Sequence, residues 1–278
     1  MVRILTRDTA VVVSVRMIDD SPHEEPLIGN ASVGVVRVGD TVRRPVTTAS
    51  ASIDALLAHL HQVGFAAAPR ALGYDDAGRQ MLSYAVGHVD PDPSDLSVGR
   101  LEDLGRLIRQ LHDAASSFVA PRGAVWNVVI APDREEIVCH NDLAPWNLVR
   151  TPTDFTIIDW DGAGPSSRLW DLAYAVHGFV PLSPRALLSD DDAAARLAAL
   201  VRGYGLDVAE RGRLVDLLAP RVRSMYELLR HGHDHGVMPW SRMWDEGHGD
   251  MWLADAHYVA LREQRWRTAL DCATDAAP

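Results

Sequence analysis

The chain has 278 residues, of which 47% are hydrophobic and 23% charged, so it can bury a sizeable core as one large domain or two smaller ones. All 27 basic residues are arginine, and the absence of lysine excludes Schiff-base chemistry and the Walker A phosphate loop, because both need a lysine amine. The net charge is −11 and the sequence contains no basic tract. Both facts argue against nucleic acid or an anionic membrane as a partner, because clustered basic residues bind these polyanions.

Residues 1–88 hold eight arginines and nine acidic residues, so nearly all of the acidity falls in residues 89–278. This surplus favours a small partner and is compatible with a cationic one. Cys139 and Cys272 are too few and too far apart for a disulfide framework, which indicates a reducing compartment, by default the cytoplasm. No apolar run approaches the ~18 residues of a membrane span. We therefore expect neither a signal peptide nor a membrane anchor.

The first ~90 residues have the pattern of strands and turns around one helix. The β-branched run Thr9–Met17 predicts a strand, and Ser32–Val38 and Thr41–Val46 predict a hairpin around the tight turn Gly39-Asp40. In Ser52–Val63 apolar residues recur at i, i+3, i+4 and i+7, which predicts an amphipathic helix that ends at Gly64. Gln80–Tyr84 predicts a further short strand.

After a stretch rich in Pro and Asp, the pattern changes to longer helices. Leu101–Leu111 carries one buried stripe, and three later segments are also helical in pattern: 191–204, 211–229 and 250–270. Two short apolar segments lie between the first and the later helices, Glu136–Cys139 and Phe155–Ile158. Each is followed at once by polar residues, so we expect the chemistry at these two strand ends.

The densest polar cluster is the segment 140–147, with the sequence HNDLAPWN, and a second burst, Asp159-Trp160-Asp161, follows the next strand. Asp142 can accept a proton from an attacking hydroxyl group. Asn147 and Asp159 can supply hard oxygen ligands to Mg²⁺ that bridges nucleotide phosphates. These residue types at this spacing favour phosphoryl transfer.

HNDLAPWN resembles the HxDxxxxN catalytic loop of protein-kinase-like phosphotransferases, and IIDWDGAGPSSRLWDLAYAV resembles the metal-binding segment and following helix of the aminoglycoside phosphotransferase family. The Pro-Trp pair before the Asn is similar to trifolitoxin-immunity-like members. The order of hairpin, helix, strand and linker also matches, so the resemblance covers nearly the whole chain. It implies that Asp142 is the catalytic base, that Asn147 and Asp159 are the metal ligands, and that Asp171 braces the loop.

The resemblance also implies an α+β, two-lobed protein-kinase-like fold with a nucleotide between the lobes. A small antiparallel-sheet lobe is expected over residues 1–84, a linker over 85–95, and a mainly helical lobe with the catalytic loop and substrate site over 96–278. Family members cover the phosphates with a hairpin, which here would bring Gly29, Asn30 and Ser32 to the nucleotide.

Family members also bind phosphate through a lysine on the third strand, and Arg43 is the best substitute for it in this chain. Neighbours on a strand point to opposite faces, so only one of Arg43 and Arg44 can face the cleft. Arginine is longer and planar, so the exchange is not conservative. The expected helix offers only Asp54 and His59 where family members have a Glu partner for the lysine.

For the nucleotide base, the strand that ends at Ser83 and Tyr84 resembles the connector whose backbone binds adenine, and Val149 and Ile158 would close the slot from the large lobe. The acceptor site is expected among the C-terminal helices, where acidic residues alternate with tryptophans, although a solvated acidic face with core tryptophans would give the same pattern. The candidates, together with Asp161, are Trp240, Trp244, Asp245, Glu246, His248, Asp250 and Trp252.

The leading hypothesis is an enzyme that moves the γ-phosphate of ATP or GTP, with Mg²⁺, to a hydroxyl group of a small molecule. An antibiotic of the aminoglycoside, nucleoside or macrolide type is the leading acceptor, which would give resistance by inactivation. A non-catalytic immunity or ligand-binding protein of the same fold is one alternative. A second alternative is a metalloprotein, because His231, His233 and His235 could bind Zn²⁺ or Ni²⁺ if that segment were extended.

Overall fold

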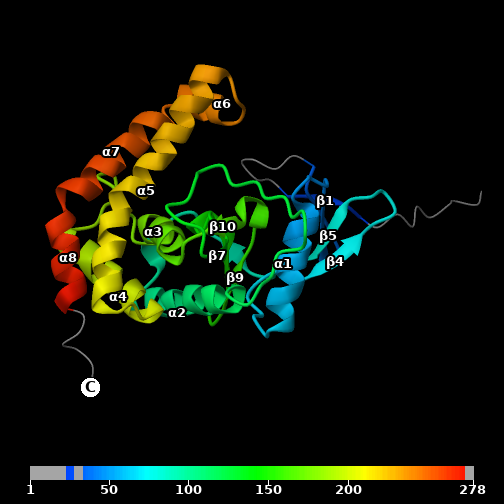
Figure 1. Cartoon of the computed structure of the whole chain (residues 1–278), viewed down its shortest axis with the longest axis horizontal. Coiled ribbons are helices and arrows are strands. Elements are labelled where there is room, and N and C mark those ends of the chain that lie inside the picture. Colours follow the sequence, from blue (N-terminus) through cyan, green and yellow to red (C-terminus); the bar gives the residue numbers. More distant parts are fainter. Residues whose placement is uncertain (1–22, 28–33, 273–278) are drawn as a thin grey trace, which may run out of the picture.

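The computed structural model describes residues 23–27 and 34–272 of the chain. The expected strand Thr9–Met17 and the proposed phosphate-binding residues Gly29, Asn30 and Ser32 lie outside these ranges. Within them the two-lobed arrangement predicted from the sequence is present: a small sheet with one helix lies at one end of the molecule and a larger helical lobe at the other (Figure 1). No helix in the described ranges has the length and apolar character needed to cross a membrane.

The small lobe is built on a five-stranded antiparallel sheet in the order β1-β2-β3-β5-β4. Its strands are β1 (Glu25–Pro26), β2 (Val36–Val38), β3 (Thr41–Arg44), β4 (Ala71–Tyr74) and β5 (Gln80–Ser83). The predicted hairpin is confirmed, because Gly39 adopts a left-handed φ of 58° in the turn that pairs Val38 with Thr41. Strand β4 was not predicted.

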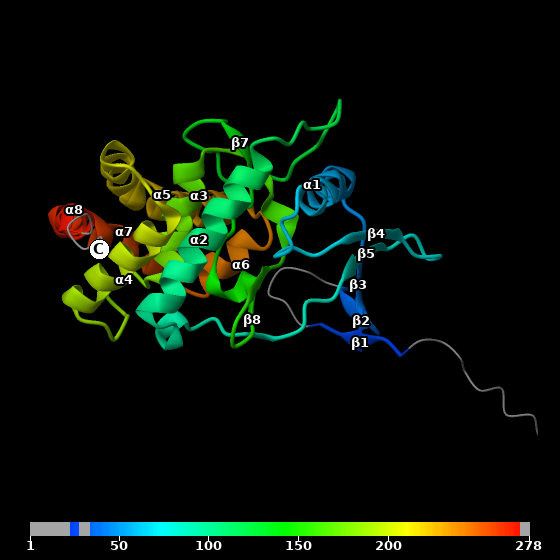
Figure 2. The ribbon, with the colours of Figure 1, turned by 90° about the horizontal axis from the view of Figure 1, so that it is seen from below.

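Helix α1 (Ser50–Gln62) confirms the predicted amphipathic helix. Its apolar face buries Ile53, Leu56, Leu57 and Leu60, each at most 4% exposed. The helix packs on β4 on one side and on the helical lobe on the other, so it lies between the sheet and the large lobe (Figure 2). The position of α1 therefore depends on both lobes.

The helical lobe begins with α2 (Val98–Ala115), after the short strand β6 (His88–Val89) and a 3-10 turn (Pro93–Asp95). Helix α2 packs closely on α4 (Asp190–Tyr204). A Cβ atom on Gly105 would lie 2.1 Å from the Leu200 carbonyl oxygen, and one on Gly203 would lie 2.0 Å from that of Glu102. These two glycines allow the backbones of the helices to touch.

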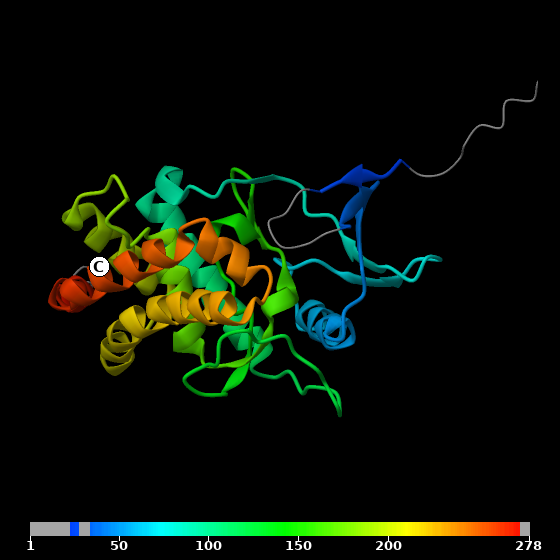
Figure 3. The same cartoon turned by 90° about the horizontal axis from the view of Figure 1, so that it is seen from above.

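Helix α3 (Arg168–Phe179) runs through the centre of this lobe, and α5 (Val208–His235), α6 (Trp240–Asp245), α7 (His248–Leu261) and α8 (Glu263–Asp271) form its outer side (Figure 3). The segment 250–270 is helical as expected, but it is divided between two helices. Helix α7 ends at Arg262 and α8 starts anew there, which lets Trp266 turn inward and become fully buried.

The two predicted short apolar segments are strands β7 (Ile137–Cys139) and β9 (Phe155–Ile157). Strand β7 pairs with β10 (Gly164–Ser166), and β9 pairs with β8 (Leu148–Arg150), which in turn pairs with β6. The loop 116–136 connects α2 to β7 and contacts α1, since the Val125 amide donates to the Ser52 hydroxyl at 2.9 Å. Both strand ends that carry the polar clusters therefore lie next to the small lobe.

Candidate active site

The segment 140–147 leaves strand β7 through an unusual backbone conformation at Asn141, whose φ is 65°. Left-handed backbone is uncommon for a residue other than glycine and is often found at functional sites. Hydrogen bonds hold it here: the Asn141 amide donates to the Asp171 carboxylate at 2.8 Å, and its side-chain amide donates to the Gly162 and Gly164 carbonyls. The next residue, Asp142, is thereby turned away from the core.

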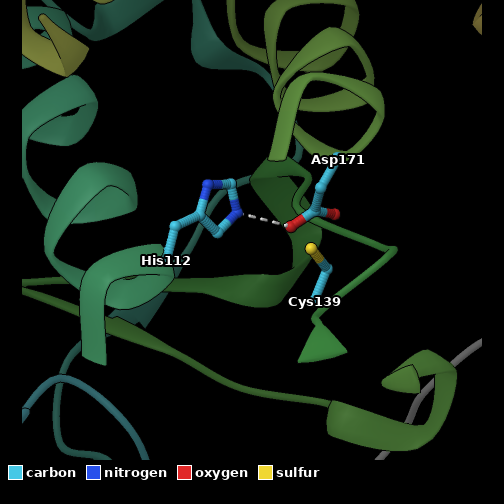
Figure 4. Close-up of side chains that lie close together, drawn as sticks. All are labelled: His112, Cys139 and Asp171. Carbon is cyan, nitrogen blue, oxygen red and sulfur yellow. Dashed lines mark hydrogen bonds and ion pairs between the residues drawn. The ribbon is translucent and has the colours of Figure 1, made fainter. Parts of the chain in front are cut away.

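The fully buried residue Asp171 is the centre of this support. Its other carboxylate oxygen lies 3.0 Å from Nε2 of His112 at the end of α2, and Nδ1 of His112 lies 2.8 Å from the Tyr204 hydroxyl (Figure 4). Cys139 also lies beside this pair, but burial raises the pKa of its thiol well above the ordinary value. The thiol of Cys139 therefore stays protonated, and we interpret these three buried side chains as structural. The contacts of Asp171 agree with the bracing role expected of it.

His140 is also fully buried and supports the loop from the other side. Its Nε2 atom lies 3.0 Å from the Ile158 carbonyl oxygen, and its Nδ1 atom accepts a hydrogen bond from the Asp142 amide at 3.2 Å. Its ring packs edge-on against Trp160 with centroids 4.8 Å apart. His140 therefore ties the segment 140–147 to the segment that follows β9.

Asp142 and Asn147 contact each other directly across the loop. The Asn147 side-chain amide donates to the Asp142 carboxylate at 2.7 Å and to its backbone carbonyl at 3.0 Å. Because the amide nitrogen is used for these bonds, the amide oxygen of Asn147 is directed elsewhere and can serve as a ligand. The Ile158 amide donates to the Asn147 carbonyl at 2.9 Å, which brings Asp159 next to this pair.

Asp159 has left-handed backbone as well, with a φ of 59°. The surrounding protein desolvates its carboxyl group and the carboxylate of Asp161 adds repulsion, so the pKa of Asp159 is raised above the ordinary value despite the opposing charge of Arg44. Removal from water disfavours the charged form of a carboxyl group, and a neighbouring carboxylate adds to that effect. Asp159 and the Asn147 oxygen form a donor set of hard oxygens, which fits a divalent cation such as Mg²⁺.

The arginines of β3 point to opposite sides of the sheet, as predicted. Arg44 forms an ion pair with Asp161, in the segment after β9, and so reaches across to the large lobe. Arg43, the residue expected to replace the lysine, pairs instead with Asp75 at 3.4 Å, on the side of the β4–β5 hairpin. Asp54 of α1 accepts hydrogen bonds from Tyr74 and Gln80. Of the two arginines, Arg44 is therefore the one that contacts the segment after β9.

The residues expected at the nucleotide base occupy the edge between the lobes. The Ser83 hydroxyl accepts a hydrogen bond from the Arg70 amide at 2.9 Å, and the Tyr84 amide donates to the Asp40 carbonyl at 2.8 Å. Val149 is buried in β8, and Ile158 is half-buried just beyond β9. Ordinary packing accounts for the positions of these two side chains.

The expected acceptor residues lie on α6 and in the first turns of α7, and two of their carboxylates have partners. Asp245 lies 3.2 Å from Nδ1 of His233, and Glu246 lies 3.6 Å from Arg242. The Trp244 ring packs on His233 and Tyr226. Asp161 takes part instead in the ion pair with Arg44, so the structure does not support its grouping with the α6 residues.

The histidine run is helical rather than extended. His231 and His235 are one helical turn apart with ring centroids separated by 4.1 Å, while His233 contacts Asp245 and Trp244. In the described residues only His112, Cys139 and Asp171 form a group of three potential ligands. The arrangement that would favour a three-histidine metal site is therefore not present.

Three residues near Asp142 were missed in the sequence. Tyr174 is buried, and burial together with the neighbouring Asp142 carboxylate raises the pKa of its phenol well above the ordinary value. Arg221 donates to the Asn141 carbonyl at 3.2 Å from a buried position on α5. Trp146 is 42% exposed although its neighbours in the loop are buried. Trp146 and Tyr174 each lie within one of the two motifs quoted from the sequence, whereas nothing in the sequence marked Arg221.

Residues 43–217 match the model of the phosphotransferase enzyme family. The chain belongs to this family. It is 34% identical over 211 residues to the trifolitoxin immunity protein of Rhizobium leguminosarum bv. trifolii, a match that covers 69% of this chain and 78% of the relative.

Two solved structures show the same fold. A choline/ethanolamine kinase family protein from Mesorhizobium loti is 20% identical, with 95% of this chain and 96% of that chain covered and a TM-score of 0.60. An amicoumacin kinase in complex with AMP-PNP, Ca²⁺ and its ligand is 12% identical, with 87% and 88% covered and a TM-score of 0.61. The family and the fold together support a small-molecule phosphotransferase.

Proposed function

We propose that this phosphotransferase moves the γ-phosphate of ATP or GTP to a hydroxyl group of a small molecule. The observation that carries the proposal is the joining of Asp142, Asn147 and Asp159 by two short connections, the Asn147–Asp142 hydrogen bond at 2.7 Å and the Ile158–Asn147 backbone bond at 2.9 Å. A carboxylate base beside two hard-oxygen ligands is the set of groups that phosphoryl transfer needs.

In the proposed reaction the acceptor hydroxyl gives its proton to the Asp142 carboxylate as its oxygen bonds to the γ-phosphorus. The bond from that phosphorus to the bridging oxygen breaks, and the nucleoside diphosphate leaves. Asn147 and Asp159 would hold Mg²⁺, which neutralises phosphate charge when bound. Most of the catalysis then rests on positioning and on charge stabilisation.

We assign the role of the missing lysine to Arg44 rather than to Arg43. Arg44 already crosses from β3 to the segment that carries Asp159, and its guanidinium group can bind phosphate oxygens in a bidentate manner. Its partner Asp161 holds it in place before the nucleotide binds. Gly29, Asn30 and Ser32 remain proposed phosphate contacts, and Ser83, Tyr84, Val149 and Ile158 remain proposed contacts of the base.

Antibiotic inactivation is the proposed biological role, supported by the amicoumacin kinase that shares the fold. We place the enzyme in the cytoplasm, where nucleotide is available and where Cys139 and Cys272 stay unpaired, as they are in the structure. The second candidate is a non-catalytic ligand-binding protein of the same fold. It is favoured by the 34% identity to an immunity protein and by the absence of lysine.

The test is to incubate the purified protein with Mg²⁺, ATP or GTP and a panel of hydroxylated antibiotics, and to record product masses. A gain of ~80 Da on one class of compound, the mass of one phosphoryl group, is expected and would identify the acceptor. The Asp142→Asn variant is the matched control and should form no product. Nucleotide binding without any product across the panel would favour the non-catalytic candidate.

A further inference from the structure

A second apolar cluster, separate from the main core, adjoins the catalytic loop. Its buried members are Ala144, Tyr174 and Met225, and the partly buried residues packed on it are Ile130, Leu228 and Trp252. They come from the catalytic loop, α3, α5, the loop 116–136 and α7. We call these six residues the apolar wall. Because Ala144 follows Asp142 by only two residues, the wall begins beside the proposed base.

Tyr174 connects the wall to the base. The Asp142 carboxylate lies near enough to the phenol of Tyr174 to contribute to its raised pKa, and the Tyr174 ring stacks on Trp252 with centroids 6.3 Å apart and planes 18° apart. Trp252 is only half-buried, so part of its indole is open to a ligand. A compound whose hydroxyl reaches Asp142 would therefore lay the rest of its body against Trp252 and the aliphatic side chains beside it.

A positive charge lies directly behind the wall. The guanidinium carbon of Arg221 is 4.2 Å from the centroid of the Tyr174 ring, and the side chain is 2% exposed. Its Nε atom has no hydrogen-bond partner, while the carboxylates of Asp171 and Asp142 lie near enough to favour its charged form. This charge already occupies one face of Tyr174, so that face of the ring is closed to a second cation.

Three carboxylates on α6 and α7 that could attract a cationic acceptor have partners, whereas the exposed residue Asp250 has none among the described residues. Asp255, close to Trp252 along α7, is buried and contacts Arg185 at 2.9 Å, His177 at 3.2 Å and the Ser183 hydroxyl at 2.7 Å. Asp245 and Glu246 are paired on α6, as described above. Apart from Asp142 itself, the wall therefore offers contact area rather than negative charge.

We propose that the apolar wall is the acceptor subsite and that it takes an uncharged hydroxyl compound with an aromatic or otherwise apolar body, rather than a polycationic aminosugar. This inference rests on the proposed phosphotransferase function and narrows its substrate class. The proposed acceptor site is thus the apolar wall and not the acidic surface of α6. In this proposal Trp252 and Leu228 determine which acceptor binds.

The experiment compares two compounds of nearly equal size that differ in charge, para-benzenedimethanol and the cationic para-(aminomethyl)benzyl alcohol, with kanamycin as a polycation. Binding is measured by calorimetry in the presence of Mg²⁺ and AMP-PNP, and phosphorylation by product mass with ATP or GTP. The dissociation constant of the neutral diol should be at least about tenfold lower than that of its cationic analogue. The reason is that the cationic group would lose water at the wall without gaining a carboxylate partner there. Kanamycin should not compete.

Two variants test the wall and one serves as the control. Trp252→Ala should weaken diol binding by about tenfold, the loss expected for one aromatic contact. Leu228→Glu should reverse the preference in favour of the cationic analogue. Trp244→Ala, a tryptophan truncation on α6, should change neither affinity by more than about twofold. Circular dichroism of each variant shows whether it is folded.

The outcomes separate the inference from the function on which it rests. Tighter binding of the cationic analogue or kanamycin by the wild type, no binding of the diol, or a larger effect of Trp244→Ala than of Trp252→Ala would each overturn the inference. If the diol binds as expected and no compound is phosphorylated, the wall is a ligand site and the phosphotransferase proposal fails instead.

Discussion

Replacement of Asp171 by alanine is the sharpest test of how the catalytic loop is held. The carboxylate is fully buried and receives two donors, the Asn141 amide at 2.8 Å and Nε2 of His112 at 3.0 Å. Because a carboxylate only accepts, Nε2 carries a proton, and removal of the carboxylate leaves both buried donors without a partner.

Each unsatisfied buried donor costs about 1–3 kcal/mol, and breaking a buried pair by removing one partner costs about 3–5 kcal/mol. We expect Asp171→Ala to lower the free energy of unfolding by about 3–5 kcal/mol. That is a large part of the ~5–15 kcal/mol typical of a folded protein. At about 2–4 °C for each kcal/mol in chains of this size class, the melting temperature should fall by roughly 6–20 °C.

Urea unfolding followed by circular dichroism measures this difference. Asp245→Ala is the matched control, because the Asp245 side chain is 65% exposed and its pair with His233 is worth about 0–1 kcal/mol. If Asp171→Ala unfolded within about 1 kcal/mol of the wild type, the buried carboxylate would not be the support of the loop that its contacts indicate.

Three further predictions concern the catalytic groups. Asp142→Ala should lower kcat by about 10²–10⁴ and leave nucleotide affinity within about twofold; steady-state kinetics and calorimetry measure the two, and retained turnover would remove Asp142 from its role. Arg44→Gln should raise KM for the nucleotide by about tenfold or more, whereas Arg43→Gln should change it by less than about twofold; equal effects in kinetic assays would contradict the assignment. Asp159→Asn should abolish Mg²⁺-dependent turnover yet raise the melting temperature at neutral pH, and a lower melting temperature in differential scanning fluorimetry would contradict this.

The sign of the Asp159 effect follows from its raised pKa. The folded state binds the Asp159 proton more tightly than the unfolded state does, so this group stabilises the fold below its ordinary pKa and loses that contribution as pH rises through the raised value. At neutral pH the charged carboxylate therefore opposes folding, and an amide removes the penalty. The same raised pKa should make turnover fall on the acid side at a pH above the ordinary range of an aspartate.

The sequence predicted the elements whose periodic patterns are strong. Helix α1, the β2–β3 hairpin and the strands before the two polar clusters were predicted correctly. An element that buries one face has apolar residues at regular spacing in the sequence. The break between α7 and α8 was missed because good helix formers continue across Arg262, and the break depends on how Trp266 packs. Strand β4 was missed because three of its four residues are exposed and the pattern carries no period.

The candidate site was predictable as far as its motif extends. Asp142, Asn147 and Asp159 were found because their spacing in HNDLAPWN and IDWD is specific to a chemistry. The choice between Arg43 and Arg44 could not be made, since it depends on which face of β3 turns to the cleft. Tyr174 lies in the segment IIDWDGAGPSSRLWDLAYAV, but nothing in that segment marks it as a neighbour of Asp142. No local pattern marks Arg221, a buried arginine that packs on a tyrosine ring.

The central claim is that Asp142, Asn147 and Asp159 form a phosphoryl-transfer centre, and it can be tested without knowing the acceptor. Water can replace the hydroxyl compound, so phosphorus NMR of ATP or GTP with Mg²⁺ should show slow release of inorganic phosphate by the wild-type protein. Asp159→Asn should show none. Binding of nucleotide by both proteins with no phosphate released by either would contradict the account and leave a protein that binds nucleotide without turning it over.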